Sequence, residues 1–265
     1  HKRDFAAAVK VAGQLARAPG NNPHRLLDVA WAIARREDAD AGCLAAAREL
    51  AARAGGMKLS PDDATYLGRV RVSLALRAAD RAAVSEAIRQ LTRSPDATPD
   101  DLKDVSDYLI GLDGGGLPAL DAALALLDRA AALAQDAAAR DDVAQPRFKA
   151  LLAKRDYPAA YAVARQVADA DDASASVLNE LAWTIASDEK IEPRDLDLAQ
   201  RMAARAVALT ESKYPNALDT YALVMYEKGD VSRAVELERQ AVQVADRPDF
   251  RVALDRYKAK LAPRH

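Results

Sequence analysis

The sequence contains few of the residues from which most enzyme sites are built. It has one cysteine, Cys43, and three histidines, His1, His24 and His265. One cysteine excludes an internal disulfide and a Cys-x-x-Cys redox pair, and the histidines show no metal-binding spacing. The glycines at 114–116 predict only a turn, because no phosphate-binding motif surrounds them. Cys43 and His24 fall on adjacent helices of one predicted hairpin, but no third group that could orient them is evident. We therefore expect a protein that is not an enzyme and that holds no metal or cofactor.

Long apolar runs and an excess of positive charge are missing as well. No run approaches the ~18 apolar residues of a transmembrane helix, so we expect no membrane insertion. The formal net charge is −2, whereas a general nucleic-acid binder is usually strongly basic. Nucleic acid is therefore not an expected partner.

Alanine supplies much of what is present. Half of the residues are hydrophobic but only 5% are aromatic, and alanine is the strongest helix former. The β-branched and aromatic residues do not gather into alternating runs, which would indicate strands. The composition and spacing predict an all-α chain.

The two tryptophans mark an internal duplication. "LLDVAWAIA" around Trp31 corresponds to "LNELAWTIA" around Trp183 at an offset of 152 residues, and the same offset aligns 2–18 with 154–170. Half of that offset reaches "LKDVSDYLI" at 102–110. Each copy has one large–large–small–large pattern at helical spacing, followed by a second helix with an alanine stripe. Shorter hairpins lie between these copies, with a turn that is five residues shorter.

These hairpins resemble the tetratricopeptide repeat (TPR), whose period is about 34 residues and whose small residues lie where paired helices touch. The resemblance covers nearly the whole chain and is strongest at 176–245. It implies an all-α, TPR-like right-handed α-solenoid of about six hairpins. These form three double-hairpin units of about 76 residues, followed by a C-terminal capping helix.

The expected organisation is a single solenoid over 1–265. Residues 2–18 match a second helix, so we expect either a piece of a longer protein or another element that covers this end. Pro146 is expected to shorten the first helix of its hairpin, since proline breaks helix interiors. The expected segments are the second helix of a truncated hairpin at 2–18, double units at 24–93, 100–169 and 176–245, and a capping helix at 248–262.

A narrower resemblance concerns the C-terminal segment. Its pieces "LNELAW", "DLDLA", "RAVALT", "ALDTYA" and "KGD" resemble the helical region behind thioredoxin-like domains in some bacterial proteins. This resemblance implies a bacterial protein with a redox domain outside this chain. The periplasm is the expected compartment if the association holds, and the cytoplasm otherwise.

Each tryptophan directly follows the small residue of a first helix. Through the six hairpins this column reads Trp31, Val72, Asp107, Lys149, Trp183 and Leu223. Burying an unpaired Asp or Lys is costly, so we predict that the column is partly exposed. First helices line the concave groove of TPR solenoids, which implies a groove-facing column. The alternative is that each tryptophan lies flat against a neighbouring first helix and only seals the stack. The predicted groove residues for a peptide or partner are His24, Leu27, Trp31, Asp107, Asn179, Trp183, Asp219, Leu223 and Tyr226.

These features favour a protein–protein interaction scaffold that binds a peptide or protein segment in the concave groove. Two alternatives stay open. One is a regulatory domain that senses a ligand or peptide, and the other is a structural spacer to a thioredoxin-like redox domain absent from this chain. The sequence does not predict an oligomeric state.

Overall fold

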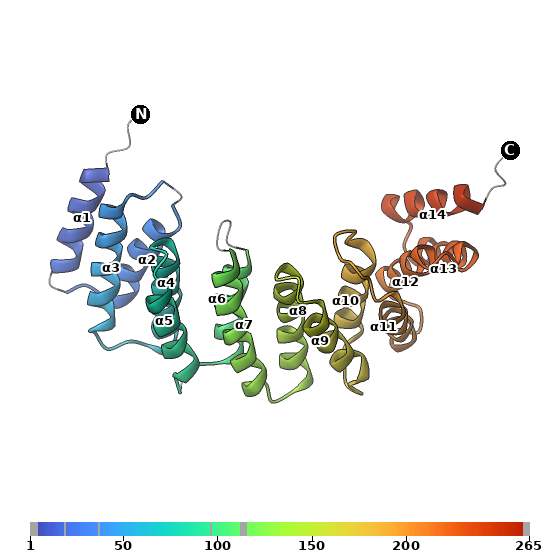
Figure 1. The fold of residues 1–265 in the computed structure, drawn as a ribbon, viewed down its shortest axis with the longest axis horizontal. Helices are drawn as coiled ribbons and strands as arrows, with labels where there is room; N and C mark the ends of the chain where they lie inside the picture. The colour runs from blue at the N-terminus through green and yellow to red at the C-terminus, as the bar shows by residue number, and fades with distance from the viewer. Residues whose placement is uncertain (1–4, 19, 37, 96, 112–115, 262–265) are drawn as a thin grey trace. The chain divides into compact units, whose positions relative to one another are not determined.

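The computed structural model describes residues 5–18, 20–36, 38–95, 97–111 and 116–261, with side chains from residue 10 onward. Within these ranges every regular element is an α-helix, which confirms the all-α prediction (Figure 1). The chain divides into two compact units, residues 1–133 and 134–265. The division falls inside the expected double unit 100–169, and the single solenoid over 1–265 stays a prediction.

The first unit consists of three helical hairpins and one additional helix. The hairpins are α2/α3, α4/α5 and α6/α7, and α1 packs mainly against α3, as a preceding second helix would. The helices are α1 (Phe5–Arg17), α2 (Pro23–Ala34), α3 (Ala41–Gly55), α4 (Pro61–Arg77), α5 (Arg81–Arg93), α6 (Pro99–Ile110) and α7 (Gly116–Leu133).

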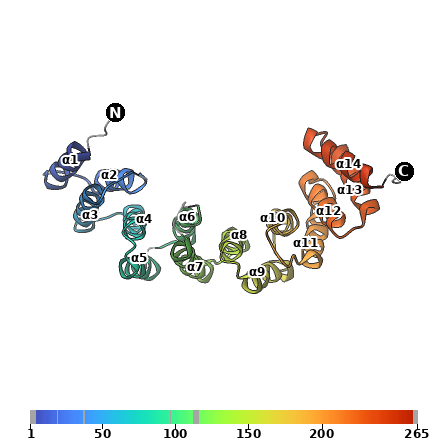
Figure 2. The same cartoon turned by 45° about the horizontal axis from the view of Figure 1, so that its top comes forward.

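The second unit repeats this plan with its additional helix at the other end. Its hairpins are α8/α9, α10/α11 and α12/α13, and α14 packs against α13 (Figure 2). Each unit is thus an α-solenoid segment of consecutive helix pairs. The helices are α8 (Ala137–Ala153), α9 (Tyr157–Asp169), α10 (Ala175–Ser187), α11 (Leu196–Leu209), α12 (Pro215–Glu227), α13 (Val231–Val244) and α14 (Pro248–Leu261).

The three short hairpins share one turn. Its middle residue has a positive φ, +53° at Ala79, +61° at Arg155 and +89° at Gly229. The next residue is always an aspartate whose amide donates to a carbonyl five residues earlier and whose side chain caps the following helix. This is a Schellman-type helix end followed directly by an N-cap, which satisfies the exposed carbonyls and amides within three residues. The caps are Asp80, Asp156 and Asp230.

The small residues predicted at the helix crossings are buried. Ala30, Ala47 and Ala54 are fully buried in the first hairpin, and their counterparts Ala182, Ala199 and Ala206 are fully buried in the fifth. The middle copy has a serine instead. The Ser106 hydroxyl donates to the Leu102 carbonyl on its own helix and contacts the Ala123 carbonyl of α7 at 3.2 Å. A polar atom is therefore accommodated at this crossing because both helices supply acceptors.

The expectation for Pro146 was wrong. Proline lies inside α8, which runs for 17 residues from Ala137 to Ala153 without interruption. A cap by Asp136 starts this helix nine residues before the proline, and the buried Phe148 and Leu151 continue it afterwards. Packing of the segment after Pro146 outweighs the loss of one backbone hydrogen bond.

Candidate interaction surface

The column that contains both tryptophans is exposed in some hairpins and buried in others. Trp31 is half-buried, Asp107 and Lys149 are exposed, and Trp183 keeps 42% of its surface exposed. Val72 and Leu223, in the same column of α4 and α12, are buried. An aliphatic side chain can be covered by its neighbours without a desolvation penalty, whereas a carboxylate or an ammonium group resists burial.

Three of the predicted groove residues are not available at the surface. Leu27 is fully buried in one core cluster with Leu26 and Ala12, and Asn179 and Leu223 are only 5% and 7% exposed. Their exposure was predicted by comparing equivalent positions of the hairpins, but neighbouring side chains bury these three residues. We therefore remove Leu27, Asn179 and Leu223 from the candidate contact residues.

Four rings from three successive first helices of the first unit lie together and are called the aromatic patch. They are His24 and Trp31 of α2, Tyr66 of α4 and Tyr108 of α6. The Trp31 ring centroid lies 4.6 Å from that of Tyr108 and 6.2 Å from that of Tyr66, at interplanar angles of 60° and 73°. His24 lies 5.6 Å from Tyr66. Tilted and edge-to-face arrangements are those that aromatic quadrupoles favour.

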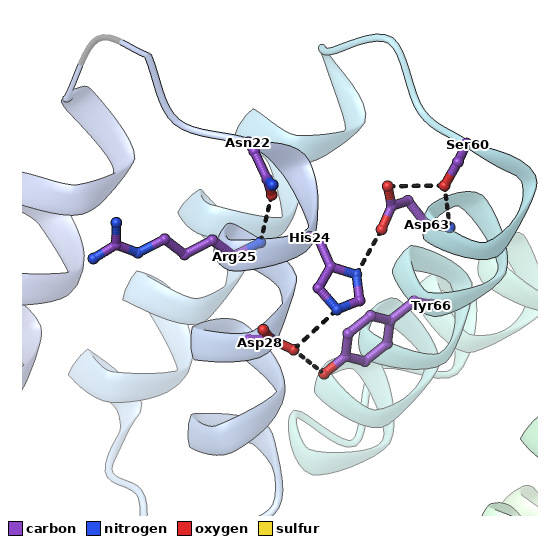
Figure 3. A network of polar contacts seen from close by, with 7 residues as sticks. All are labelled: Asn22, His24, Arg25, Asp28, Ser60, Asp63 and Tyr66. Atoms are coloured by element: carbon purple, nitrogen blue, oxygen red, sulfur yellow. Dashed lines mark hydrogen bonds and ion pairs between the residues drawn. The ribbon is translucent and has the colours of Figure 1, made fainter.

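A polar network holds one end of the patch (Figure 3). The His24 Nδ1 atom is 2.8 Å from Asp63 Oδ1, and its Nε2 atom is 3.8 Å from Asp28 Oδ1. The Tyr66 hydroxyl donates to Asp28 at 3.2 Å, and the Ser60 hydroxyl donates to Asp63 at 2.9 Å. The hydrogen bond to Asp63, with Asp28 nearby, raises the pKa of His24, and the same bond lowers the pKa of Asp63. The imidazolium form of His24 is therefore favoured between the two carboxylates.

The network begins at helix ends that the sequence makes stable. Asn22 caps α2 by accepting from the Arg25 amide at 2.9 Å, and Pro23 occupies the first turn. Ser60 caps α4 by accepting from the Asp63 amide at 3.1 Å. Both caps set the starting points of adjacent first helices, so His24 and Asp63 meet at the same level.

Hydrogen bonds involving the hydroxyl groups position the two tyrosine rings of the patch. Tyr108 forms a 2.8 Å hydrogen bond with the fully buried Ser73 of α4. Burial, with Asp28 as the next cause, raises the pKa of Tyr66 to about 12. The Tyr66 phenol therefore stays protonated at neutral pH and continues to donate its hydrogen bond.

Two arginines stand over the patch. The Arg69 guanidinium carbon lies 5.7 Å from the ring centroids of both Trp31 and Tyr66, and that of Arg35 lies 6.0 Å from Trp31. These distances are within cation–π range.

Arg35 follows directly after α2, so His24, Asp28, Trp31 and Arg35 form one stripe at helical spacing. That stripe is the sequence signal that could have revealed the patch.

The predicted residues of the second unit have different roles. Tyr226 stacks on Tyr257 of α14 with centroids 4.6 Å apart, and Arg256 lies over both rings. Burial raises the pKa of Asp219 to about 6 beside the fully buried Glu238. Tyr226 and Asp219 therefore belong to the surroundings of α14, while Trp183 is an exposed ring on α10.

No catalytic or metal constellation appears among the described residues. Cys43 is buried, and burial raises the pKa of its thiol, which disfavours the reactive thiolate. His24, the candidate partner of Cys43, contacts Asp28 and Asp63. No group of three His, Cys, Asp or Glu side chains within the described ranges is placed to hold a metal ion. In the same ranges, none of the helices has the length and apolar character needed to cross a membrane.

These observations define an all-α protein built from stacked helical hairpins. Models of known protein families do not match the chain. Curated proteins do not match it either. Among solved structures it is similar to an assembly chaperone of RpL4, Acl4 (residues 1–338), at 15% identity. The alignment covers 91% of this chain and 85% of that chain with a TM-score of 0.34, so the assignment of fold and site rests on the contacts above.

Proposed function

We propose that this chain is a protein–protein interaction scaffold whose aromatic patch binds a peptide or protein segment. The observation that carries the proposal is the half-exposed Trp31 ring among Tyr66, Tyr108 and His24 on three first helices. Tryptophan, tyrosine and arginine are the residues that most often dominate binding energy at protein interfaces.

The patch is already ordered before any partner arrives. Tyr108 is held by Ser73, Tyr66 by Asp28, and Trp31 packs on the core of the first unit. A preformed surface loses less side-chain entropy on binding, which favours affinity. Trp183, 42% exposed on α10, is a separate candidate contact within the second unit.

The sensor alternative has less support. It would need an enclosed apolar pocket lined by Trp31 or Trp183. The two cavities described in the first unit measure about 610 and 310 Å³ and lie along α5 and α7 and along α3, α4 and α5. Neither contains a residue of the aromatic patch.

Membership of the TPR class and the link to a thioredoxin-like domain also belong to the proposal. The shared three-residue turns and the buried small residues support a TPR-like repeat. The thioredoxin link rests only on the resemblance of the C-terminal segment. A Cys-x-x-Cys motif in coding sequence upstream of residue 1 would support the spacer function.

The test is selection of peptides from a phage-displayed library of random 12-residue sequences against the full chain. Trp183→Phe leaves Trp31 as the only tryptophan, so its fluorescence should shift when a selected peptide binds the patch. We expect Trp31→Ala to weaken binding at least about 10-fold. Leu117→Ala, at a 59% exposed position in the cleft between α5 and α7, is the matched control and should bind normally. Equal loss in both variants, or no change in Trp31 fluorescence, would contradict the proposal.

A further inference from the structure

The aromatic patch carries two cations that none of the described carboxylates neutralises. Across the ranges that the structure describes, no carboxylate forms an ion pair with Arg35 or Arg69. The Nε–H group of Arg69 is buried and donates to no acceptor within these ranges. Neighbouring Arg36, in contrast, pairs with Asp38 at 3.0 Å.

The carboxylates nearest to the patch are already engaged. Asp63 and Asp28 contact His24, and Asp28 also accepts from Tyr66. Asp107, next to Tyr108 in the sequence of α6, pairs with Lys103 at 2.8 Å. Among the described side chains, positive charge therefore predominates at the Trp31 end of the patch.

A guanidinium over an aromatic ring can still bind an anion. The ring contacts one face of the planar group, whereas the N–H donors point outward along its edge. Two such groups beside Trp31 suit a carboxylate, which accepts hydrogen bonds with two oxygens. The half-exposed indole next to them offers contact area to an apolar side chain.

We propose that the partner is an acidic protein segment, in which an Asp or Glu carboxylate meets Arg35 and Arg69 while an adjacent apolar side chain packs on Trp31. This inference rests on the proposed function and adds the chemistry of the partner. A phosphate backbone is disfavoured because Asp28 and Asp63 line the other end of the patch and the chain has a net charge of −2.

The experiment uses the same 12-residue peptide library against the full chain. Peptides selected by the wild type should be enriched in Asp and Glu about two-fold or more over the unselected library. Affinity for the best acidic peptide should fall about 10- to 100-fold in Arg35→Gln/Arg69→Gln, and it should depend less on salt. Arg36→Gln is the matched control because this arginine is adjacent but paired. Arg35→Gln alone, at an exposed position, replaces the double variant if that variant loses helicity.

The outcomes separate the two proposals. Only the acidic partner is overturned if the selected peptides are neutral or basic. The same holds if peptides that require Trp31 bind the arginine variants as tightly as they bind the wild type. Failure to select any peptide that requires Trp31 overturns both. A 20-nucleotide oligothymidylate provides the third outcome. If it binds more tightly than every selected peptide, and if this binding is lost in the arginine variants, the assignment to a protein segment is overturned.

Discussion

Trp31 of α2 and Tyr108 of α6 have ring centroids 4.6 Å apart, although the whole α4/α5 hairpin separates their helices in the sequence. The contact is possible because α4 presents the small Ser73 at this level, and its hydroxyl bonds to Tyr108. Two rings thus join the first and third hairpins of the unit across the middle one. Trp31 consequently has a packing role as well as an exposed edge.

The two tryptophans should differ in their effect on stability. Trp31→Ala removes contacts with Tyr66, Tyr108 and the core, and should lower the free energy of unfolding by about 1–3 kcal/mol. Trp183→Ala removes a ring that is 42% exposed and should cost less, about 1 kcal/mol or below. Urea unfolding followed by circular dichroism measures both. Equal losses would mean that both rings mainly seal the stack.

The shared turn predicts stabilising substitutions. Arg155 has a φ of +61° in the position that Gly229 occupies in the equivalent turn. Arg155→Gly should raise the free energy of unfolding by about 0.5–1 kcal/mol, because glycine adopts this conformation without steric cost. Gly229→Ala, at a φ of +89°, should lower it by about 1 kcal/mol. Thermal unfolding of the two variants should shift in opposite directions, and a shift in the same direction would argue against the turn geometry.

Gly68 of α4 lies directly against Leu91 of α5. A Cβ atom at Gly68 would lie 2.1 Å from Leu91 Cδ2 and 2.5 Å from Leu91 Cγ. Gly68→Ala should therefore lower the free energy of unfolding by about 1–3 kcal/mol through overpacking. Gly13→Ala in α1 meets nothing within 4 Å and should be neutral or stabilising by up to about 1 kcal/mol.

A double-mutant cycle tests the cause of this cost. If Leu91 is the obstacle, Gly68→Ala combined with Leu91→Ala should be less destabilising than the sum of the single changes. Additive losses would show that the penalty arises from another contact.

The buried acidic pair beneath α14 predicts a pH dependence. Burial raises the pKa of Glu238 from its ordinary value of 4.5 to about 8, with Asp219 as the next cause. Asp249, Arg256 and Tyr257 also face the pair from α14. The folded state therefore holds a proton that the unfolded chain releases above pH 4.5. The free energy of unfolding should fall as pH rises from about 4.5 to 8 and level off above that.

Glu238→Gln isolates this contribution. The variant should lose much of the slope between pH 5 and 8 and be more stable than the wild type at pH 9, by about 1–3 kcal/mol. His24, whose pKa is also raised, contributes a slope of the same sign in both proteins, so their difference reports on Glu238. Glu236→Gln, an exposed pair with Arg233, should leave the slope unchanged. Parallel wild-type and Glu238→Gln curves would contradict the raised pKa of Glu238.

The helical architecture could be predicted from sequence because it depends on local patterns. Helical spacing of large and small residues predicted the hairpins, and Gly229-Asp230 predicted a turn that recurs at Ala79 and Arg155. The shortening of the helix expected at Pro146 did not occur, since local propensity was outweighed by burial of Phe148 and Leu151. The expected compartment and the link to a redox domain stay predictions.

The candidate surface depended on tertiary packing. The repeat alignment placed Leu27 and Leu223 beside exposed residues, yet both are buried, because coverage depends on the neighbouring helices and not on position within a repeat. Tyr108 lies 77 positions from Trp31, and no local pattern could bring their rings together. Residue periodicity thus determined which segments become helices and how they pair. Only the packed helices decided which side chains meet, which charges are neutralised, and which of the two tryptophans is ringed by tyrosines and arginines.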